Sequence, residues 1–112
     1  MGDGQSRRPI KNKYKRETTV DMKWVEDFLC LADTRSFSRS ASERHSSQPA
    51  FSRRIRSLET WLGATLVDRS CNPPSLTPAG HVFRGHALGI MQQVHKAKHI
   101  LRHAPDYPGG AI

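Results

Sequence analysis

The sequence has few cysteines and no long apolar run. Its two cysteines, Cys30 and Cys71, are too few for a zinc finger and a poor basis for a disulfide framework. We interpret Cys30 as a small core residue, because apolar side chains surround it in the sequence. No stretch is apolar enough to span a bilayer, and no apolar segment typical of a signal peptide follows the basic N-terminus. We therefore expect a cytoplasmic protein without a metal or cofactor.

Acidic residues are also scarce. The 112 residues include 18 Lys and Arg against 10 Asp and Glu, which gives a formal net charge of +8. Such a charge favours a polyanion such as nucleic acid, although anionic membranes and acidic proteins would attract it too. Between Asp68 and Asp106 there is no acidic residue at all, so this tract is continuously basic. No nucleophile with its base, phosphate-binding loop or carboxylate pair is visible, which argues against an enzyme.

Four segments are expected along the chain. Residues 1–21 are polar, basic and aperiodic, which predicts a disordered arm. Residues 22–77 carry the patterns of a small folded domain, and residues 78–104 those of one long helix. Residues 105–112 are rich in Pro and Gly and predict a flexible tail.

The first part of the folded domain predicts two helices. Apolar residues recur at helical spacing from Met22 and fade by Thr34, which predicts a first amphipathic helix. A short second helix is expected through Glu43, with Ser38 as its N-cap.

A third helix is predicted more strongly. Ser47 is its expected N-cap, Pro49 lies in its first turn, and Gly63 ends it as a left-handed cap. From Gln48 onward, one apolar stripe runs at steps of four, three and four, through Phe51, Ile55, Leu58 and Leu62.

A small β-hairpin and a long helix follow. Residues 66–69 and 75–77 are strand candidates on either side of a turn rich in Asn and Pro. Thr77 followed by Pro78 predicts the start of a helix that runs to about His103. Its apolar residues alternate by four and three, which is the seam of a coiled coil whose partner is a second copy. The residues of this seam are Phe83, Ala87, Ile90, Val94, Ala97, Leu101 and Ala104.

This order of elements predicts a mainly α fold, a winged helix-turn-helix followed by a dimerisation helix. The third helix turns its apolar stripe inward, so its polar face is free to enter a major groove of double-stranded DNA. Gln48 fits adenine and Arg53 fits guanine, while Ser47 or Ser52 could contact a base or a phosphate. Phosphate clamps are expected from Arg39, Arg54 and Arg69. The full predicted DNA-binding set is Ser38, Arg39, Ser47, Gln48, Pro49, Ser52, Arg53, Arg54, Arg56, Arg69, Asn72 and Ser75.

A resemblance to a known family is carried by two stretches, SFSRSASERHSSQPAFSRRIRSLETWLG and LVDRSCNPPSLTPAG. They closely resemble the N-terminal DNA-binding domain of LysR-type transcriptional regulators, and the resemblance extends from Met22 to about His103. It implies a helix-turn-helix over residues 37–56, a wing over residues 69–75, and a linker helix from Pro78 that pairs two subunits. It therefore implies a dimeric, nucleoid-associated regulator of transcription.

The sequence also departs from this family. Such proteins often have leucine at position 44 and valine at position 46, where this chain has Arg44 and Ser46. If both sites are buried, about 1–3 kcal/mol of apolar stabilisation is lost. The family continues into an effector domain for which 112 residues leave no room. We therefore expect a truncated regulator, a separately encoded half or a fragment, with no small-molecule effector and with residues 1–21 as an extension before Met22.

Two alternative functions remain open on the sequence. The chain could be a DNA-inactive dimerisation module that interferes with full-length relatives; seam variants would then abolish its function, and variants of Gln48 or Arg53 would not. Alternatively, His95, His99 and His103 share one helix face and could make a metal- or pH-responsive dimer. No Cys, Asp or Glu completes a ligand set there, which favours a solvated helix flank.

Overall fold

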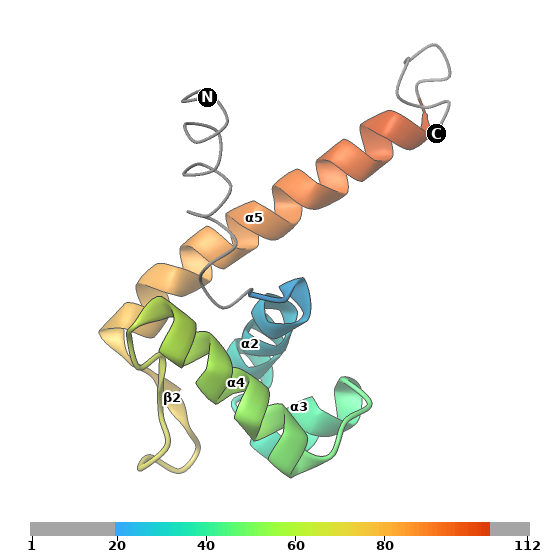
Figure 1. The fold of residues 1–112 in the computed structure, drawn as a ribbon. Coiled ribbons are helices and arrows are strands. Elements are labelled where there is room, and N and C mark those ends of the chain that lie inside the picture. Colours follow the sequence, from blue (N-terminus) through green and yellow to red (C-terminus); the bar gives the residue numbers. More distant parts are fainter. Residues whose placement is uncertain (1–19, 104–112) are drawn as a thin grey trace, which may run out of the picture.

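A computed structural model describes residues 20–103 of the chain. It contains four helices and one antiparallel hairpin (Figure 1): α2 (Met22–Thr34), α3 (Phe37–Glu43), α4 (Gln48–Leu62), β1 (Val67–Asp68), β2 (Ser75–Leu76) and α5 (Pro78–Arg102). The order and types of these elements confirm the winged helix-turn-helix followed by a long helix. The predicted arm over residues 1–21 and the tail over residues 105–112 lie almost wholly outside the described residues.

The α3 helix begins earlier than its sequence predicts. Its N-cap is Ser36, whose backbone is extended and whose Oγ accepts a hydrogen bond from the Arg39 N–H at 3.0 Å. Ser38, the predicted cap, lies inside the first turn and is exposed. Two serines two residues apart offer the same capping chemistry, so the prediction of Ser38 was wrong because composition alone does not separate them.

The ends of α4 are as predicted. Ser47 Oγ accepts a hydrogen bond from the Ala50 N–H at 3.2 Å, and Pro49 lies in the first turn, where a missing N–H breaks no helical bond. Gly63 ends the helix in the left-handed region at φ 73°.

The hairpin is short and is fastened to both neighbouring helices. Val67 pairs with Leu76 and Asp68 with Ser75, so each strand is shorter than predicted. The Thr77 hydroxyl donates to the Thr65 carbonyl at 2.6 Å and accepts from the Gly80 N–H at 3.0 Å. Thr77 therefore caps α5, as predicted, and also ties the hairpin to the start of that helix.

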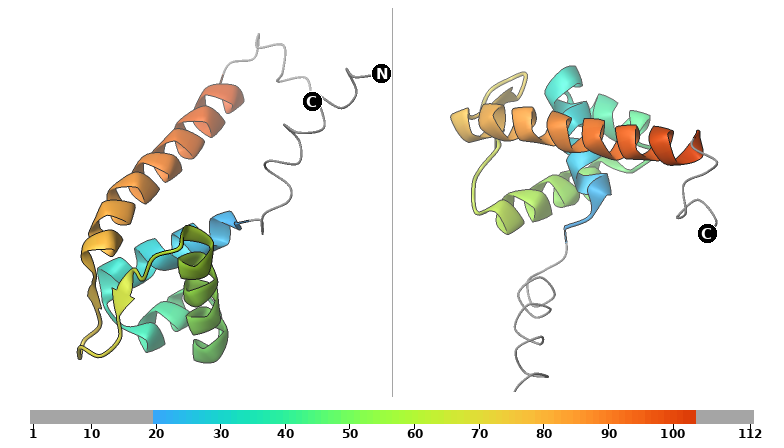
Figure 2. Two further views of the ribbon diagram at one scale, coloured as in Figure 1. Left: turned by 60° about the vertical axis from the view of Figure 1, so that its left-hand side comes forward. Right: turned by 90° about the horizontal axis from the view of Figure 1, so that it is seen from above.

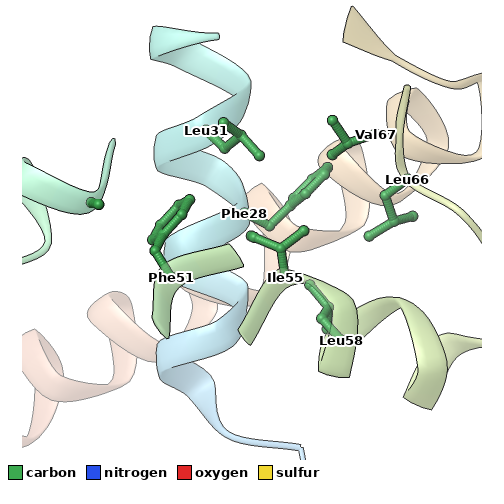
Figure 3. Close-up of a cluster of buried hydrophobic side chains, with 8 residues drawn as sticks. Phe28, Leu31, Phe51, Ile55, Leu58, Leu66 and Val67 are labelled. Carbon is green, nitrogen blue, oxygen red and sulfur yellow. The ribbon is translucent and has the colours of Figure 1, made fainter. Parts of the chain in front are cut away.

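A single apolar core joins α2, α3, α4 and β1 (Figure 3). Its members are Phe28, Leu31, Ala41, Phe51, Ile55, Leu58, Leu66 and Val67. Cys30 was predicted to be a core residue and is not one of them. It is half-buried, and its Sγ lies 3.5 Å from Glu43 Oε1 at the rim of the domain. Burial raises the pKa of this thiol.

The two halves of α5 have different surroundings (Figure 2). In the first half, the Phe83 ring packs 5.4 Å from the Phe28 ring, and Ala87 is fully buried. Both were predicted to face a second copy, and the structure instead places them against the chain's own domain. In the second half, every residue from 92 to 103 is exposed.

Candidate nucleic-acid interface

The first turns of α4 present polar side chains to solvent. Gln48, Pro49, Arg53 and Arg56 are exposed, whereas Phe51, Ile55 and Leu58 on the opposite face are buried. Within residues 20–103, neither Arg53 nor Arg56 takes part in an ion pair. In Figures 1 and 2 the start of α4, helix α3 and the tip of the hairpin all lie on the side of the domain away from the projecting half of α5. This surface is called the α4 face below.

The turn between α3 and α4 is tight and closed by backbone hydrogen bonds. The Ser46 N–H donates to the Ala41 carbonyl at 2.9 Å, and the His45 N–H donates to the Ser42 carbonyl at 3.1 Å. His45 adopts a left-handed backbone at φ 56°, which is uncommon for a residue with a side chain. This turn fixes the direction in which α4 leaves α3.

A buried carboxylate fastens this turn to α2. Asp27 is 0% exposed, and it accepts a hydrogen bond from Arg44 Nε at 2.7 Å. It also accepts from Arg54 Nε at 2.5 Å and from Arg54 Nη2 at 3.2 Å. Arg54 Nη1 further donates to the Ser46 hydroxyl at 3.1 Å. One carboxylate thus links α2, the end of α3 and the middle of α4.

This network changes two interpretations of the sequence. Arg44 and Ser46 were expected to cost apolar burial, but both take part in the network. Arg44 also donates to Glu26 at 3.1 Å. Burial lowers the pKa of Arg44, but its hydrogen bonds and charge attraction to Asp27 and Glu26 outweigh that effect and raise it. Arg54 was predicted as a phosphate clamp, but its guanidinium donates hydrogen bonds to Asp27 and Ser46. This geometry suits a role in positioning α4 better than a contact to phosphate.

The base of the wing is fastened to α4 by a second pair of contacts. The Glu59 carboxylate accepts hydrogen bonds from the Leu66 N–H at 2.8 Å and the Val67 N–H at 3.2 Å. Arg69 Nη1 donates to the Ser52 hydroxyl at 2.6 Å, and the Arg69 guanidinium stacks 4.6 Å from the Phe37 ring. Burial, followed by the proximity of Arg56, lowers the pKa of Arg69, and Glu59 partly offsets this.

The other predicted contact residues lie on α3, at the start of α4 and in the hairpin. Ser38, Arg39, Ser47 and Asn72 are exposed, and Ser75 is half-buried. Arg39 forms a 3.2 Å ion pair with Glu43 one turn later, but its side chain stays 71% exposed. The elements that carry these residues, namely α3, the start of α4 and the hairpin, lie on one side of the domain (Figures 1 and 2). Reasoning from the sequence missed Asp27 and Phe37, whose roles depend on contacts far along the chain.

The C-terminal histidines form no metal cluster. Within residues 20–103, no group of three or more His, Cys, Asp or Glu side chains could hold a metal ion. The His99 and His103 rings lie 4.4 Å apart, and His103 Nδ1 is 2.9 Å from the His99 carbonyl.

None of the described helices is long and apolar enough to cross a membrane.

Comparison with known proteins agrees with the fold. Residues 22–81 match the model of the bacterial regulatory helix-turn-helix proteins of the lysR family. The chain therefore belongs to the LysR family. The HTH-type transcriptional regulator YjiE of Escherichia coli K12 is 41% identical over 88 residues, which is 79% of this chain and 29% of YjiE. YjiE and BbuR are named as HTH-type transcriptional regulators, and HcaR of Escherichia coli K12 as a transcriptional activator.

Solved structures support the same assignment. The structure of Vibrio fischeri DarR in complex with DNA superposes with a TM-score of 0.73 at 46% identity, covering 76% of this chain and 29% of DarR. The BenM DNA-binding domain in complex with catB site 1 DNA gives a TM-score of 0.71 at 28% identity, covering 73% of this chain and 88% of that one. The chain thus spans under a third of the length of YjiE and DarR and most of the isolated BenM domain.

Proposed function

We propose that this protein regulates transcription by binding specific double-stranded DNA sites as a homodimer in the cytoplasm. The observation that carries the proposal is the α4 face, where Gln48, Arg53 and Arg56 are exposed at the open end of a rigidly held helix. A helix presented in this way fits the major groove, and its first residues reach the base edges. The DNA complexes of DarR and of the BenM DNA-binding domain support it by similarity.

The α4 face contains residues suited to contact base edges and residues suited to contact phosphates. Gln48 can pair with adenine and Arg53 with guanine through two hydrogen bonds each. At the start of α4, beside Pro49, the Ser47 hydroxyl and the Gln48 N–H can donate to a phosphate, whereas the Ala50 N–H already donates to Ser47 Oγ. Arg39 and Arg56 are exposed cations suited to contact the phosphate backbone of DNA. Asn72 and Ser75 lie in the wing. Arg54 acts through the position of α4.

Replacing Arg53 by alanine tests the reading role. If Arg53 contacts a base, Arg53→Ala costs about 1–3 kcal/mol of binding free energy and relaxes the preference at a single base position. The measurement is the affinity of the protein for a set of DNA sites that differ by single base pairs, at one fixed salt concentration. Lys23→Ala is the control, because it removes one exposed positive charge from α2, away from the α4 face.

The control also separates reading from simple charge attraction. Lys23→Ala is expected to weaken all sites slightly and equally. If Arg53→Ala also weakened every site by the same factor, Arg53 would be a phosphate contact and its reading role would be wrong.

Dimerisation is assigned to the projecting half of α5. Ile90, Val94 and Leu101 are 42%, 45% and 46% exposed, and with Ala97 they form one apolar stripe along α5. A second copy of the same helix would bury this stripe by the coiled-coil spacing of four and three.

A charge placed in the stripe tests this assignment. Val94→Glu would put a carboxylate into the interface and is expected to weaken self-association at least about tenfold, with a parallel loss of binding to two half-sites. Analytical ultracentrifugation measures the association. Gln92→Glu adds the same charge on the opposite side of α5 and should leave the dimer intact. If both variants self-associated equally, the interface would lie elsewhere. A protein that dimerises without binding DNA would favour the DNA-inactive alternative.

A further inference from the structure

Arg69, at the base of the wing, packs against the domain. Its side chain is only 24% exposed, and its guanidinium stacks on Phe37 instead of extending from the hairpin. Its Nη1 donates a 2.6 Å hydrogen bond to Ser52 on the α4 face. Its Nη2 is buried without a hydrogen-bond partner, 4.0 Å from Glu59 Oε1. Burial of a cation with an unsatisfied donor lowers the stability of the fold. We therefore expect the function of the protein to explain why Arg69 lies here.

The contact restricts what Ser52 can do. A serine hydroxyl has one proton and two lone pairs, and arginine has only donors, so Arg69 must occupy a lone pair of Ser52 Oγ. Within residues 20–103, Ser52 donates its own proton to no acceptor. The proton is therefore available to a bound molecule. The adjacent positive charge of Arg69, with Arg56 close by, favours an incoming group of negative or partly negative character.

We infer that Arg69 is a positioning residue that makes Ser52 a hydrogen-bond donor toward DNA. Ser52 would then contact an acceptor, either a phosphate oxygen or the N7, O6 or O4 atom of a base edge, and would disfavour an amino group there. The inference deepens the proposed function and rests on it. Because the hydroxyl is held before DNA arrives, little side-chain freedom is lost on binding.

Arginine suits this role better than lysine. Its planar guanidinium stacks on the Phe37 ring and directs one N–H at Ser52 at the same time. Through this contact the base of the wing and the α4 face would act together, although the two segments are 17 residues apart.

A double-mutant cycle tests the inference. The affinity of the full chain for its selected DNA site is measured for Ser52→Ala, Arg69→Met and the double variant. Arg56→Met is the control, because it removes a neighbouring charge and makes no hydrogen bond to Ser52 among the described residues. Ser52→Ala is expected to weaken binding about five- to tenfold. In the Ser52→Ala background, Arg69→Met should reduce the DNA affinity by no larger a factor than Arg56→Met does.

Each outcome decides the question. If Arg69→Met weakens binding by the same factor with and without Ser52, Arg69 does not act through Ser52 and the inference is wrong. If the unmodified protein binds no DNA sequence preferentially, the proposed function fails and the inference fails with it. Thermal unfolding shows whether Arg69→Met folds; Arg69→Lys, which keeps the charge, runs through the same cycle as a second variant.

Modified DNA identifies the acceptor without any change at Arg69. Methylphosphonate linkages remove phosphate charge one at a time, and 7-deazapurines remove N7 one at a time. One such change should weaken DNA binding by the unmodified protein and leave DNA binding by the Ser52→Ala variant unchanged. If no position behaves in this way, and base analogues lacking O6 or O4 do not either, Ser52 is not a donor to DNA.

Discussion

Asp27→Asn is expected to destabilise the fold by about 3 kcal/mol, because it removes the one charge that two arginines share in the interior. Asp27 is 0% exposed, whereas Arg44 and Arg54 keep 26% and 23% of their side-chain exposure. The two cations can therefore recover part of their hydration, which places the cost at the low end for a broken buried pair. Urea unfolding followed by circular dichroism measures the difference.

The matched control lies on the same helix. Asp33→Asn makes the same chemical change at a carboxylate that is 74% exposed and 3.6 Å from Arg84. An exposed pair contributes little, so this variant should change the free energy of unfolding by less than about 1 kcal/mol. Equal effects of the two substitutions would show that Asp27 does not fasten the helices. Because Asp27 positions the turn before α4, DNA affinity should fall with stability in Asp27→Asn and not in Asp33→Asn.

Gly80→Ala is expected to separate the wing from α5. A Cβ at Gly80 would lie 2.1 Å from the Leu66 carbonyl oxygen and 3.2 Å from the Leu76 Cβ. The Leu66 oxygen is backbone and also accepts a 2.9 Å hydrogen bond from the Thr77 N–H, so it has little freedom to move. We expect a loss of about 3 kcal/mol, the upper end of the usual cost of overpacking.

A second glycine of α5 should respond in the opposite direction. A Cβ at the exposed Gly85 would meet nothing within 4 Å, so Gly85→Ala should stabilise the helix by about 0.5–1 kcal/mol. Thermal unfolding of both variants distinguishes the two effects by sign. If Gly80→Ala were also neutral or stabilising, the close packing of α5 on the hairpin would be wrong.

Local signals account for what the sequence predicted well. Ser47 with Pro49, and Thr77 with Pro78, mark helix starts through the chemistry of a few adjacent residues, and Gly63 marks an end in the same way. The apolar stripe of α4 then determines which of its residues remain outside. The exposed residues of the α4 face could therefore be chosen from the sequence.

Non-local contacts account for what it did not predict. Asp27 meets Arg44 and Arg54 across 17 and 27 residues, and no spacing rule indicates such a pair. For the same reason Arg54 resembles a free phosphate clamp in the sequence. Phe83 and Ala87 continue the rhythm of Ile90 and Val94, and this rhythm cannot show that the first two are buried within their own domain.

Selection from a pool of random duplexes, followed by sequencing of the retained DNA, shows whether the protein recognises a specific site as a dimer. A homodimer presents two copies of α4, so we expect enrichment of a site with two symmetry-related halves, about one helical turn or a multiple of it apart. Retention that disappears as salt rises, without enrichment of any sequence, would contradict this expectation and would leave only charge attraction between a basic protein and DNA.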